Sequence, residues 1–131
     1  MGASVTGDVK SYRDLLVWQK AISISVSCYQ LTKDFPRDEL YGMTSQIRRS
    51  SVSIAANIAE GFGREQTRPF IHFLRISQGS LKELETHLVI AEQVQLAQGR
   101  DVEPLMRATA ELGRMLRAMI RSLETKLLDQ S

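Results

Sequence analysis

Four segments of the chain repeat apolar residues at alternating spacings of three and four, and this pattern restricts the fold more than any other feature of the sequence. Such spacing places the apolar side chains on one face of an α-helix, which has about 3.6 residues per turn. No segment sustains the apolar–polar alternation that is typical of a half-buried strand. The pattern therefore predicts four helices, at residues 11–35, 44–61, 67–98 and 101–128.

The ends of these segments carry residues that commonly begin or terminate helices. Ser11, with Asp14 three residues later, resembles a capping box, and Pro36 is expected to end the first helix. Gly61 and Gly63 are expected to end the second helix, because glycine readily adopts the left-handed conformation that follows a helix. The other boundaries are predicted from residues of the same kinds: Thr44 or Ser45 and Thr67 as caps, Gly99 as the end of the third helix, and Asp101 as the cap of the fourth.

The links between the predicted helices are short, which favours antiparallel neighbours. We therefore expect an all-α protein with an antiparallel up-down-up-down four-helix bundle. A chain of 131 residues, of which 43% are hydrophobic and 24% charged, has the size and composition of one globular domain. Residues 1–10 are expected to form a flexible N-terminal tail, and residues 11–131 the four-helix-bundle domain.

The first predicted helix carries two apolar stripes about 110° apart, which is wider than one bundle contact needs. The pattern allows two interpretations: a helix deeply buried in one bundle, or one stripe for the bundle core and one for a neighbouring subunit. One stripe contains Leu15, Trp18, Ile22, Ser25 and Tyr29. Under the second interpretation, the oligomer interface is assigned to the other stripe, which contains Val17, Ala21, Ile24, Cys28 and Leu31.

Small side chains dominate the second predicted helix. Residues 50–64 read SSVSIAANIAEGFGR, and most of the residues other than the isoleucines are Ser, Ala or Gly. Small side chains allow helix backbones to approach closely. We therefore expect the second helix to be the most enclosed of the four, packed on more than one side.

Residue patterns typical of enzymes are missing from the sequence. His72 and His87 are 15 residues apart, which on one helix is a rise of over 20 Å, about 1.5 Å per residue, and too far for a shared metal. GFGREQ lacks the Lys-Ser/Thr of a phosphate-binding loop. A single cysteine, Cys28, cannot form an internal disulfide and fits a reducing cytoplasm. We predict a cytoplasmic protein that is not an enzyme, has no metal or cofactor, and has no membrane association.

Basic and acidic residues are segregated along the chain. Twelve of the 17 basic residues are arginine, which suits planar contacts with phosphate or carboxylate. Residues 48–82 contain six basic and two acidic residues, whereas residues 83–103 contain five acidic and one basic. This segregation allows two interpretations: a solvated surface with salt bridges between subunits, or a surface that follows the phosphates of RNA or DNA.

The fourth predicted helix carries the clearest basic stripe, because its arginines recur every seven residues. No aromatic residue accompanies this stripe, which argues against readout of a single strand by base stacking. The candidate nucleic-acid-binding residues are Arg48, Arg49, Arg64, Arg68, Arg107, Arg114, Arg117 and Arg121.

Several motifs together resemble one known family. QIRRSSVSIAANIAEGFGR at residues 46–64 resembles the signature of the four-helix-bundle proteins encoded in intervening sequences of bacterial 23S rRNA genes. Residues 15–21, 35–42 and 77–85 carry further parts of the same pattern. The resemblance covers residues 12–98, and the fourth helix matches by pattern alone. Ser50-Ser51 and Ser77 depart from the family pattern, in which alanine is common at these positions.

The resemblance implies a closed ring of five bundles. A related branch, the accessory proteins of diversity-generating retroelements, is basic and binds nucleic acid. Asn57, Glu60 and Gly61 belong to the family motif, but the resemblance does not assign them a role. We therefore expect a non-catalytic homo-oligomer, a pentamer, that associates with structured RNA or other nucleic acid through its arginines. The alternative is an oligomeric scaffold that binds a protein partner and no nucleic acid.

Overall fold

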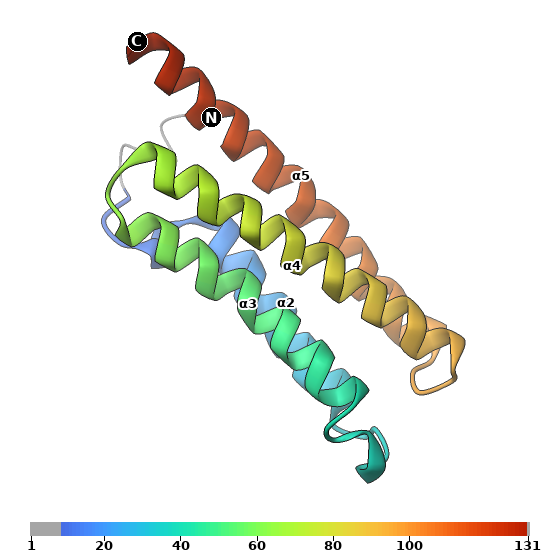
Figure 1. The fold of residues 1–131 in the computed structure, drawn as a ribbon. Helices are drawn as coiled ribbons and strands as arrows, with labels where there is room; N and C mark the ends of the chain where they lie inside the picture. The colour runs from blue at the N-terminus through green and yellow to red at the C-terminus, as the bar shows by residue number, and fades with distance from the viewer. Residues whose placement is uncertain (1–8, 131) are drawn as a thin grey trace.

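The computed structural model describes residues 9–130 and shows four long helices packed as antiparallel neighbours (Figure 1). The predicted all-α class and bundle are confirmed, and no strand occurs within the described residues. The predicted tail lies largely outside these residues; Val9 packs against the core, and the Lys10 N–H donates to Asp14. The helices are α2 Leu16–Thr32, α3 Met43–Gly63, α4 Thr67–Gln93 and α5 Gly99–Gln130, with short 3-10 helices η1 Tyr12–Asp14 and η2 Arg37–Glu39.

Each helix packs against the next one in the chain, and α2 and α5 close the bundle. The contact between α3 and α4 is the most extensive, and the contact between α2 and α5 is the least extensive of these four. A helix of 32 residues such as α5 is about 48 Å long, whereas α2 with 17 residues is about 26 Å long. The C-terminal end of α5 therefore extends past the other helices (Figure 1).

The start of the chain differs from the prediction in one respect. The capping box is present, with the Ser11 hydroxyl accepting from Arg13 N and the Asp14 carboxylate accepting from the Ser11 N–H. It begins the 3-10 helix η1 rather than an α-helix, because Leu15 adopts an extended conformation between η1 and α2. The first α-helix thus begins five residues later than predicted, at Leu16, and ends at Thr32, before Pro36.

Of the predicted glycine stops, Gly63 does end α3, but those at Gly61 and Gly99 are wrong. Helix α3 runs through Gly61 to Gly63, and Gly99 begins α5 instead of ending α4. The residues in the left-handed conformation are Glu65 (φ 60°), after α3, and Gln95 (φ 67°), after α4; no described glycine has a positive φ. The predicted caps are also corrected, since the residues that precede the helices are Gly42 before α3, Gln66 before α4 and Gln98 before α5.

Helix α3 packs on more than one side, against α2 and α4, and its small residues allow this close packing. Ser50 and Ser51 are completely buried and donate to backbone carbonyls of their own helix. The Ser77 hydroxyl of α4 donates to the carbonyl oxygen of Ile54 in α3 at 2.9 Å, which requires the two helices to lie very close together. The hydroxyl at a position where alanine is common in the resembling family is therefore satisfied by the neighbouring backbone.

Gly61 has a packing function instead of a terminating one. A Cβ at this position would lie 2.7 Å from Cβ of Phe73 and 3.3 Å from the carbonyl oxygen of Phe70. Real Cβ atoms do not approach so closely, so only glycine allows α3 and α4 to meet here. Among residues 9–130, no helix combines the length and apolar character needed to cross a bilayer.

Candidate nucleic-acid interface

Arg48 joins α3 to α2. Its Nε donates to the Thr32 hydroxyl at 2.9 Å, and its guanidinium carbon lies 4.6 Å from the centre of the Tyr29 ring. Thr32 in turn donates to the carbonyl oxygen of Cys28. A stacked and hydrogen-bonded guanidinium of this kind stabilises the contact between two helices. Arg48 is therefore engaged within the chain.

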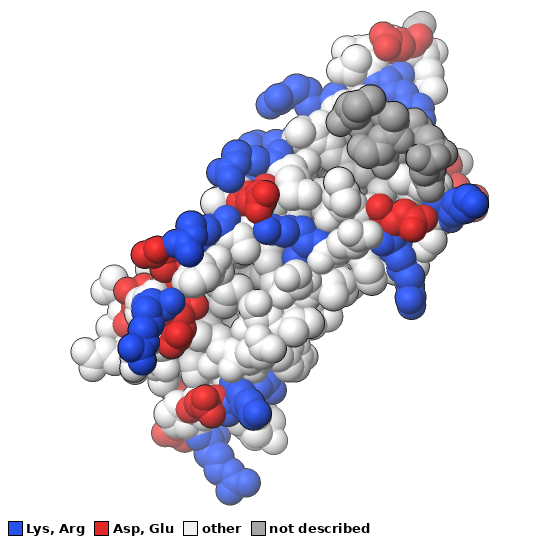
Figure 2. Space-filling model, turned by 180° about the vertical axis from the view of Figure 1, so that it is seen from behind, with Lys and Arg blue, Asp and Glu red and all other residues white. Residues whose placement is uncertain are grey.

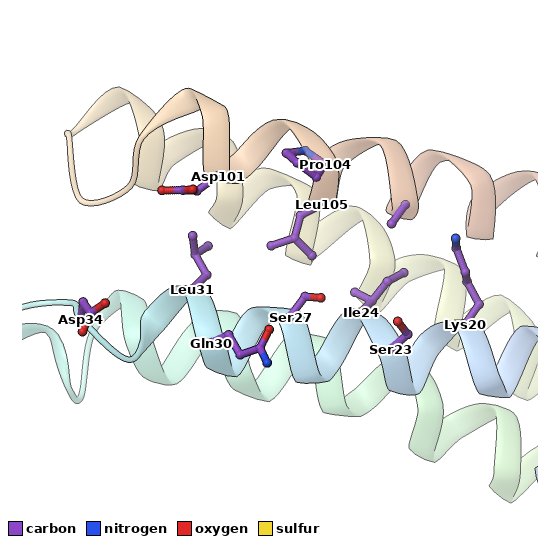
Figure 3. A pocket seen from close by; sticks show the side chains of 11 residues that line it. Lys20, Ser23, Ile24, Ser27, Gln30, Leu31, Asp34, Asp101, Pro104 and Leu105 are labelled. Atoms are coloured by element: carbon purple, nitrogen blue, oxygen red, sulfur yellow. The ribbon is translucent and has the colours of Figure 1, made fainter.

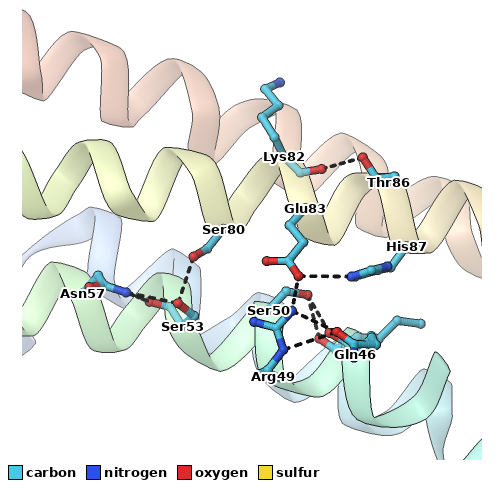
Figure 4. Close-up of polar contacts among 11 residues, drawn as sticks. Gln46, Arg49, Ser50, Ser53, Asn57, Ser80, Lys82, Glu83, Thr86 and His87 are labelled. Carbon is cyan, nitrogen blue, oxygen red and sulfur yellow. Dashed lines mark hydrogen bonds and ion pairs between the residues drawn. The ribbon is translucent and has the colours of Figure 1, made fainter. Parts of the chain in front are cut away.

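Arg49 joins α3 to α4 on the other side. It donates to the side-chain oxygen of Gln46 and forms an ion pair with Glu83, which also lies 3.4 Å from Nε2 of His87 (Figure 4). Partial burial raises the pKa of Glu83, but the hydrogen bonds and charges of Arg49 and His87 outweigh this effect and lower the pKa below its usual value of 4.5. The basic pair Arg48-Arg49 thus connects α3 to both of its neighbours.

Two further predicted arginines are engaged within the chain. Arg64 pairs with Glu60 at 2.9 Å and lies over the ring of Phe73, 5.0 Å from its centre. Arg107 pairs with Glu103, one turn earlier on α5. Both pairs are exposed, so each contributes little to stability.

The remaining four predicted arginines are exposed on α4 and α5, and Arg117 lines a hollow between these two helices. Arg114, Arg117 and Arg121 occupy one side of α5, and Arg68 lies at the start of α4. The ion pair between Arg75 of α4 and Glu124 of α5 shows that these two helix faces adjoin. We call this set the basic strip: Arg68, Arg75, Lys82, Arg114, Arg117 and Arg121. Arg75 and Lys82 were missed as members, although they continue the seven-residue spacing of Arg68.

Members of the basic strip differ in how they are paired. Lys82 pairs with Glu85 at 3.1 Å. The hydrogen bond and the charge of Lys20 lower the pKa of Glu111, and the charge of Arg114 adds to this effect. Within residues 9–130, Arg68, Arg117 and Arg121 form no ion pair. The strip therefore retains a clear excess of positive charge.

The motif residues of unknown role have contacts inside the chain. The Asn57 amide donates to the Ser53 carbonyl at 2.8 Å and to the Ser53 hydroxyl at 3.0 Å, and this hydroxyl lies 2.8 Å from that of Ser80 on α4 (Figure 4). Glu60 pairs with Arg64, and Gly61 permits the close approach of α4. These contacts favour a structural role for the segment.

The structure corrects the predicted oligomer interface. Four of its residues, Val17, Ala21, Ile24 and Cys28, are buried in the core of the single chain, and Leu31 is half-buried against it. They are buried because α3 and α5 both pack onto this side of α2. The exposed apolar residues of α2 are instead Leu16, Ile22, Val26 and Tyr29, with exposed fractions of 61%, 37%, 52% and 45%. The last three lie on successive turns.

The exposed side of α2 carries no charge between Lys20 and Lys33. Seen from behind, the molecule shows a broad uncharged area just below its centre, with basic and acidic side chains around it (Figure 2). Val52 of the neighbouring helix α3 is also 45% exposed. The sequence indicates this face, because residues 21–32 contain no charged residue on any side of the helix, whereas a single buried stripe requires uncharged residues on one side only.

A pocket of about 430 Å³ lies between α2 and α5, where the bundle is least tightly closed (Figure 3). Its walls carry small or polar side chains such as Ser23, Ser27 and Ala108, with Asp34 and Asp101 at one end. Lys20, which also lines it, is paired with Glu111 at 2.6 Å. Within the described part of the chain, no group of three His, Cys, Asp or Glu residues could hold a metal ion.

Cys28 is buried beside Ser51, and burial raises the pKa of its thiol to about 12, although the hydrogen bond with Ser51 acts in the opposite direction. A thiol with this pKa stays protonated at neutral pH and is a poor nucleophile. His72 is exposed on α4, far from His87 on the same helix. Among the contacts described for residues 9–130, Cys28 and His72 do not form a pair of nucleophile and base.

The fold and the surface define a four-helix-bundle protein in which one group of exposed basic residues, the basic strip, follows α4 and α5. Residues 13–118 match the 23S rRNA-intervening sequence protein family, and the chain belongs to this family. A crystal structure of a protein of unknown function from the S23 ribosomal protein family of Bacteroides thetaiotaomicron VPI-5482 superposes with a TM-score of 0.72. It is 24% identical, and the match covers 80% of this chain and 98% of that chain, which shows a shared fold. No curated protein shows significant similarity to the chain.

Proposed function

We propose that the protein is a non-catalytic homo-oligomer whose basic strip binds the phosphates of structured RNA or other nucleic acid. The observation that carries this proposal is the separation of two surfaces: the basic strip on α4 and α5, and the uncharged face of α2. In a bundle whose neighbours follow chain order, α2 lies diagonally across from α4. One surface can therefore contact another subunit while the other remains accessible.

The basic strip suits a polyanion better than a protein ligand. Its arginines lie on successive turns of α5, and Arg68, Arg117 and Arg121 have no acidic partner in the described part of the chain. Cations that neutralise phosphates release condensed counterions, and this release drives binding at low salt. The same proposal is supported by the related branch of accessory proteins of diversity-generating retroelements, which is basic and binds nucleic acid.

The uncharged face of α2 supports self-association. Ile22, Val26 and Tyr29 lie on successive turns, and contiguous exposed apolar side chains commonly mark an interface. A second copy of the chain presents the same surface and would bury Ile22 and Val26 against it. The closed ring of five bundles in the resembling family supports a pentamer.

A salt series with fluorescent structured RNA and duplex DNA tests the function. We expect binding at low salt that weakens steeply towards physiological salt, and a shallower salt slope for the Arg114→Ala, Arg121→Ala double variant. Arg13→Ala, Arg37→Ala is the matched control, because it removes the same charge outside the strip. Light scattering on each variant verifies that assembly is unchanged.

Absence of binding by the wild type at low salt, or equal losses in the two double variants, would contradict the proposal. The alternative, an oligomeric scaffold for a protein partner, would then be favoured. The uncharged face of α2 is the observation that supports this alternative, because apolar helix faces also bind other proteins.

A further inference from the structure

Two glycines lie in the middle of long helices without being needed by the packing of the chain. Gly79 belongs to α4, and a Cβ there would meet no atom within 4 Å. Gly113 belongs to α5, and a Cβ there would lie 3.6 Å from Arg117 Nη1 and from Leu81 Cδ2, which is ordinary van der Waals contact. Glycine in a helix interior is destabilising relative to alanine. Unlike Gly61, neither residue stabilises the bundle through a close approach.

Both glycines line the same hollow between α4 and α5. It has a volume of about 310 Å³, and its other lining residues are Gln78, Leu81, Lys82 and Arg117. None of its lining residues in the described part of the chain is acidic. The hollow therefore combines an open floor, two cationic side chains from different helices and an amide, in the middle of the basic strip.

We propose that this hollow is a seat for a phosphate group of a nucleic-acid backbone. The inference rests on the proposed function and specifies where a phosphate is held. Gly79 is exposed, so the absence of a side chain there lets the sugar-phosphate chain lie against α4. Gly113 is buried, and the absence of its side chain leaves room for Arg117, whose Nη1 would lie 3.6 Å from a Cβ at this position. Lys82 can then donate from the α4 side and Arg117 from the α5 side, which are the charge-assisted hydrogen bonds that phosphate favours.

The existing ion pair of Lys82 does not prevent phosphate from binding in the hollow. Lys82 pairs with Glu85, three residues away, in a pair whose lysine side chain is 70% exposed. Such a pair is weak and exchanges readily for a doubly contacted anion. A helix from a second copy is a less suitable occupant, because it would remove both cations from water without supplying a matching charge.

Alanine substitution of the two glycines distinguishes phosphate binding in the hollow from a purely structural role of these residues. We expect Gly79→Ala and Gly113→Ala to keep or raise the melting temperature, because alanine favours the helix. We expect each to weaken binding of a short structured RNA at least threefold, and to make the salt slope shallower although no charge is removed. The slope should change by about 0.9 for one lost phosphate contact on duplex DNA.

Gly63→Ala is the matched control, because a Cβ at Gly63 also meets nothing within 4 Å and the residue lies at the end of α3, outside the hollow. It should bind RNA as the wild type does. If the wild type binds RNA but Gly79→Ala and Gly113→Ala bind like Gly63→Ala, the phosphate seat is overturned and the proposed function stands. A change of assembly in light scattering for Gly79→Ala assigns the glycine to a subunit contact and also overturns the seat.

A second probe works without RNA binding. Inorganic pyrophosphate is titrated into ¹⁵N-labelled protein, and the amide signals of Gly79 and Gly113 are followed. Saturable shifts that are lost in a Lys82→Ala, Arg117→Ala double variant support the seat, even if the wild type binds no RNA and the proposed function fails. Absence of saturable shifts in the wild type overturns the seat.

Discussion

The guanidinium of Arg48 lies over the ring of Tyr29, with 4.6 Å between the guanidinium carbon and the ring centre. The Nε of the same guanidinium donates a hydrogen bond to the Thr32 hydroxyl, so one side chain of α3 contacts two residues of α2. Because Tyr29 is 45% exposed, Arg48 also covers one edge of the uncharged face. An arginine of the family motif thus supports the position of α2 and the surface that α2 presents.

Replacing Arg48 should therefore weaken the contact between α2 and α3. We expect Arg48→Ala to lower the free energy of unfolding by about 1–2 kcal/mol, from the lost cation–π contact and the lost hydrogen bond. Arg48→Lys should recover part of this loss, because lysine can keep the charge near the ring but not the planar hydrogen-bonding geometry. Urea unfolding measures both, with Arg37→Ala as an exposed control. Equal stability of Arg48→Ala and the control would contradict the structural role.

Gly61 should tolerate no larger residue. We expect Gly61→Ala to lower the free energy of unfolding by about 1–3 kcal/mol, because the new Cβ overpacks the contact with Phe73 and the backbone at Phe70. Gly63→Ala, two residues later, should be neutral or slightly stabilising, since its Cβ would meet nothing. Thermal unfolding of the two variants side by side tests the contrast, and similar melting temperatures would argue against it.

The two sides of α2 should respond differently to a charge. Val26→Glu places a carboxylate on the exposed face, and we expect loss of assembly in light scattering with the helical circular dichroism spectrum kept. Ile24→Arg places a cation at a position that is 2% exposed, and we expect loss of the fold itself, because an unpaired charge in the core is strongly destabilising. A Val26→Glu variant that assembles normally would remove this face from the interface.

The ion pair of Glu83 should make stability depend on pH. Its pKa is lowered in the folded state, so the stabilisation is complete above the usual value of 4.5 and is lost as the pH falls through the folded-state pKa. At pH 7 we expect Glu83→Gln to be less stable than the wild type by about 0.5 kcal/mol, a value reduced by solvent screening. The difference should vanish in acid.

Urea unfolding at several pH values measures this difference, with Glu92→Gln as the control on the same helix. Glu92 forms no ion pair within the described residues, so its substitution should show little pH-dependent effect. A stability gap for Glu83→Gln that persists unchanged in acid would show that Glu83 acts through packing and not through its charge.

Local features of the sequence were sufficient for the class of fold. Three-four spacing predicted four helices, and the Ser11–Asp14 capping box was found where predicted. The boundaries were less predictable, because Gly61 was read as a terminator and is a packing residue within α3. Glycine at Gly61 and Gly63 looks the same in the sequence, and only the position of α4 distinguishes the two.

The candidate site depended still more on partners that are distant in the chain. Arg49 and Glu83 are 34 residues apart, and Arg75 and Glu124 are 49 residues apart. No local pattern indicates which arginine will find a carboxylate across a helix contact. The sequence identified eight candidates, of which the structure engages four in ion pairs, hydrogen bonds or ring contacts inside the chain.

The sequence by itself determined the helices, their amphipathic faces and the small residues of α3, because periodicity and side-chain size act between residues within a few turns of one another. The tertiary structure decided which stripe of α2 is buried. The two stripes are similar in apolar character, and the choice depends on where α3 and α5 pack. That packing buries Ile24 of one stripe and leaves Ile22 of the other exposed, although both are isoleucines on the same helix, since a rotation of about 200° separates them.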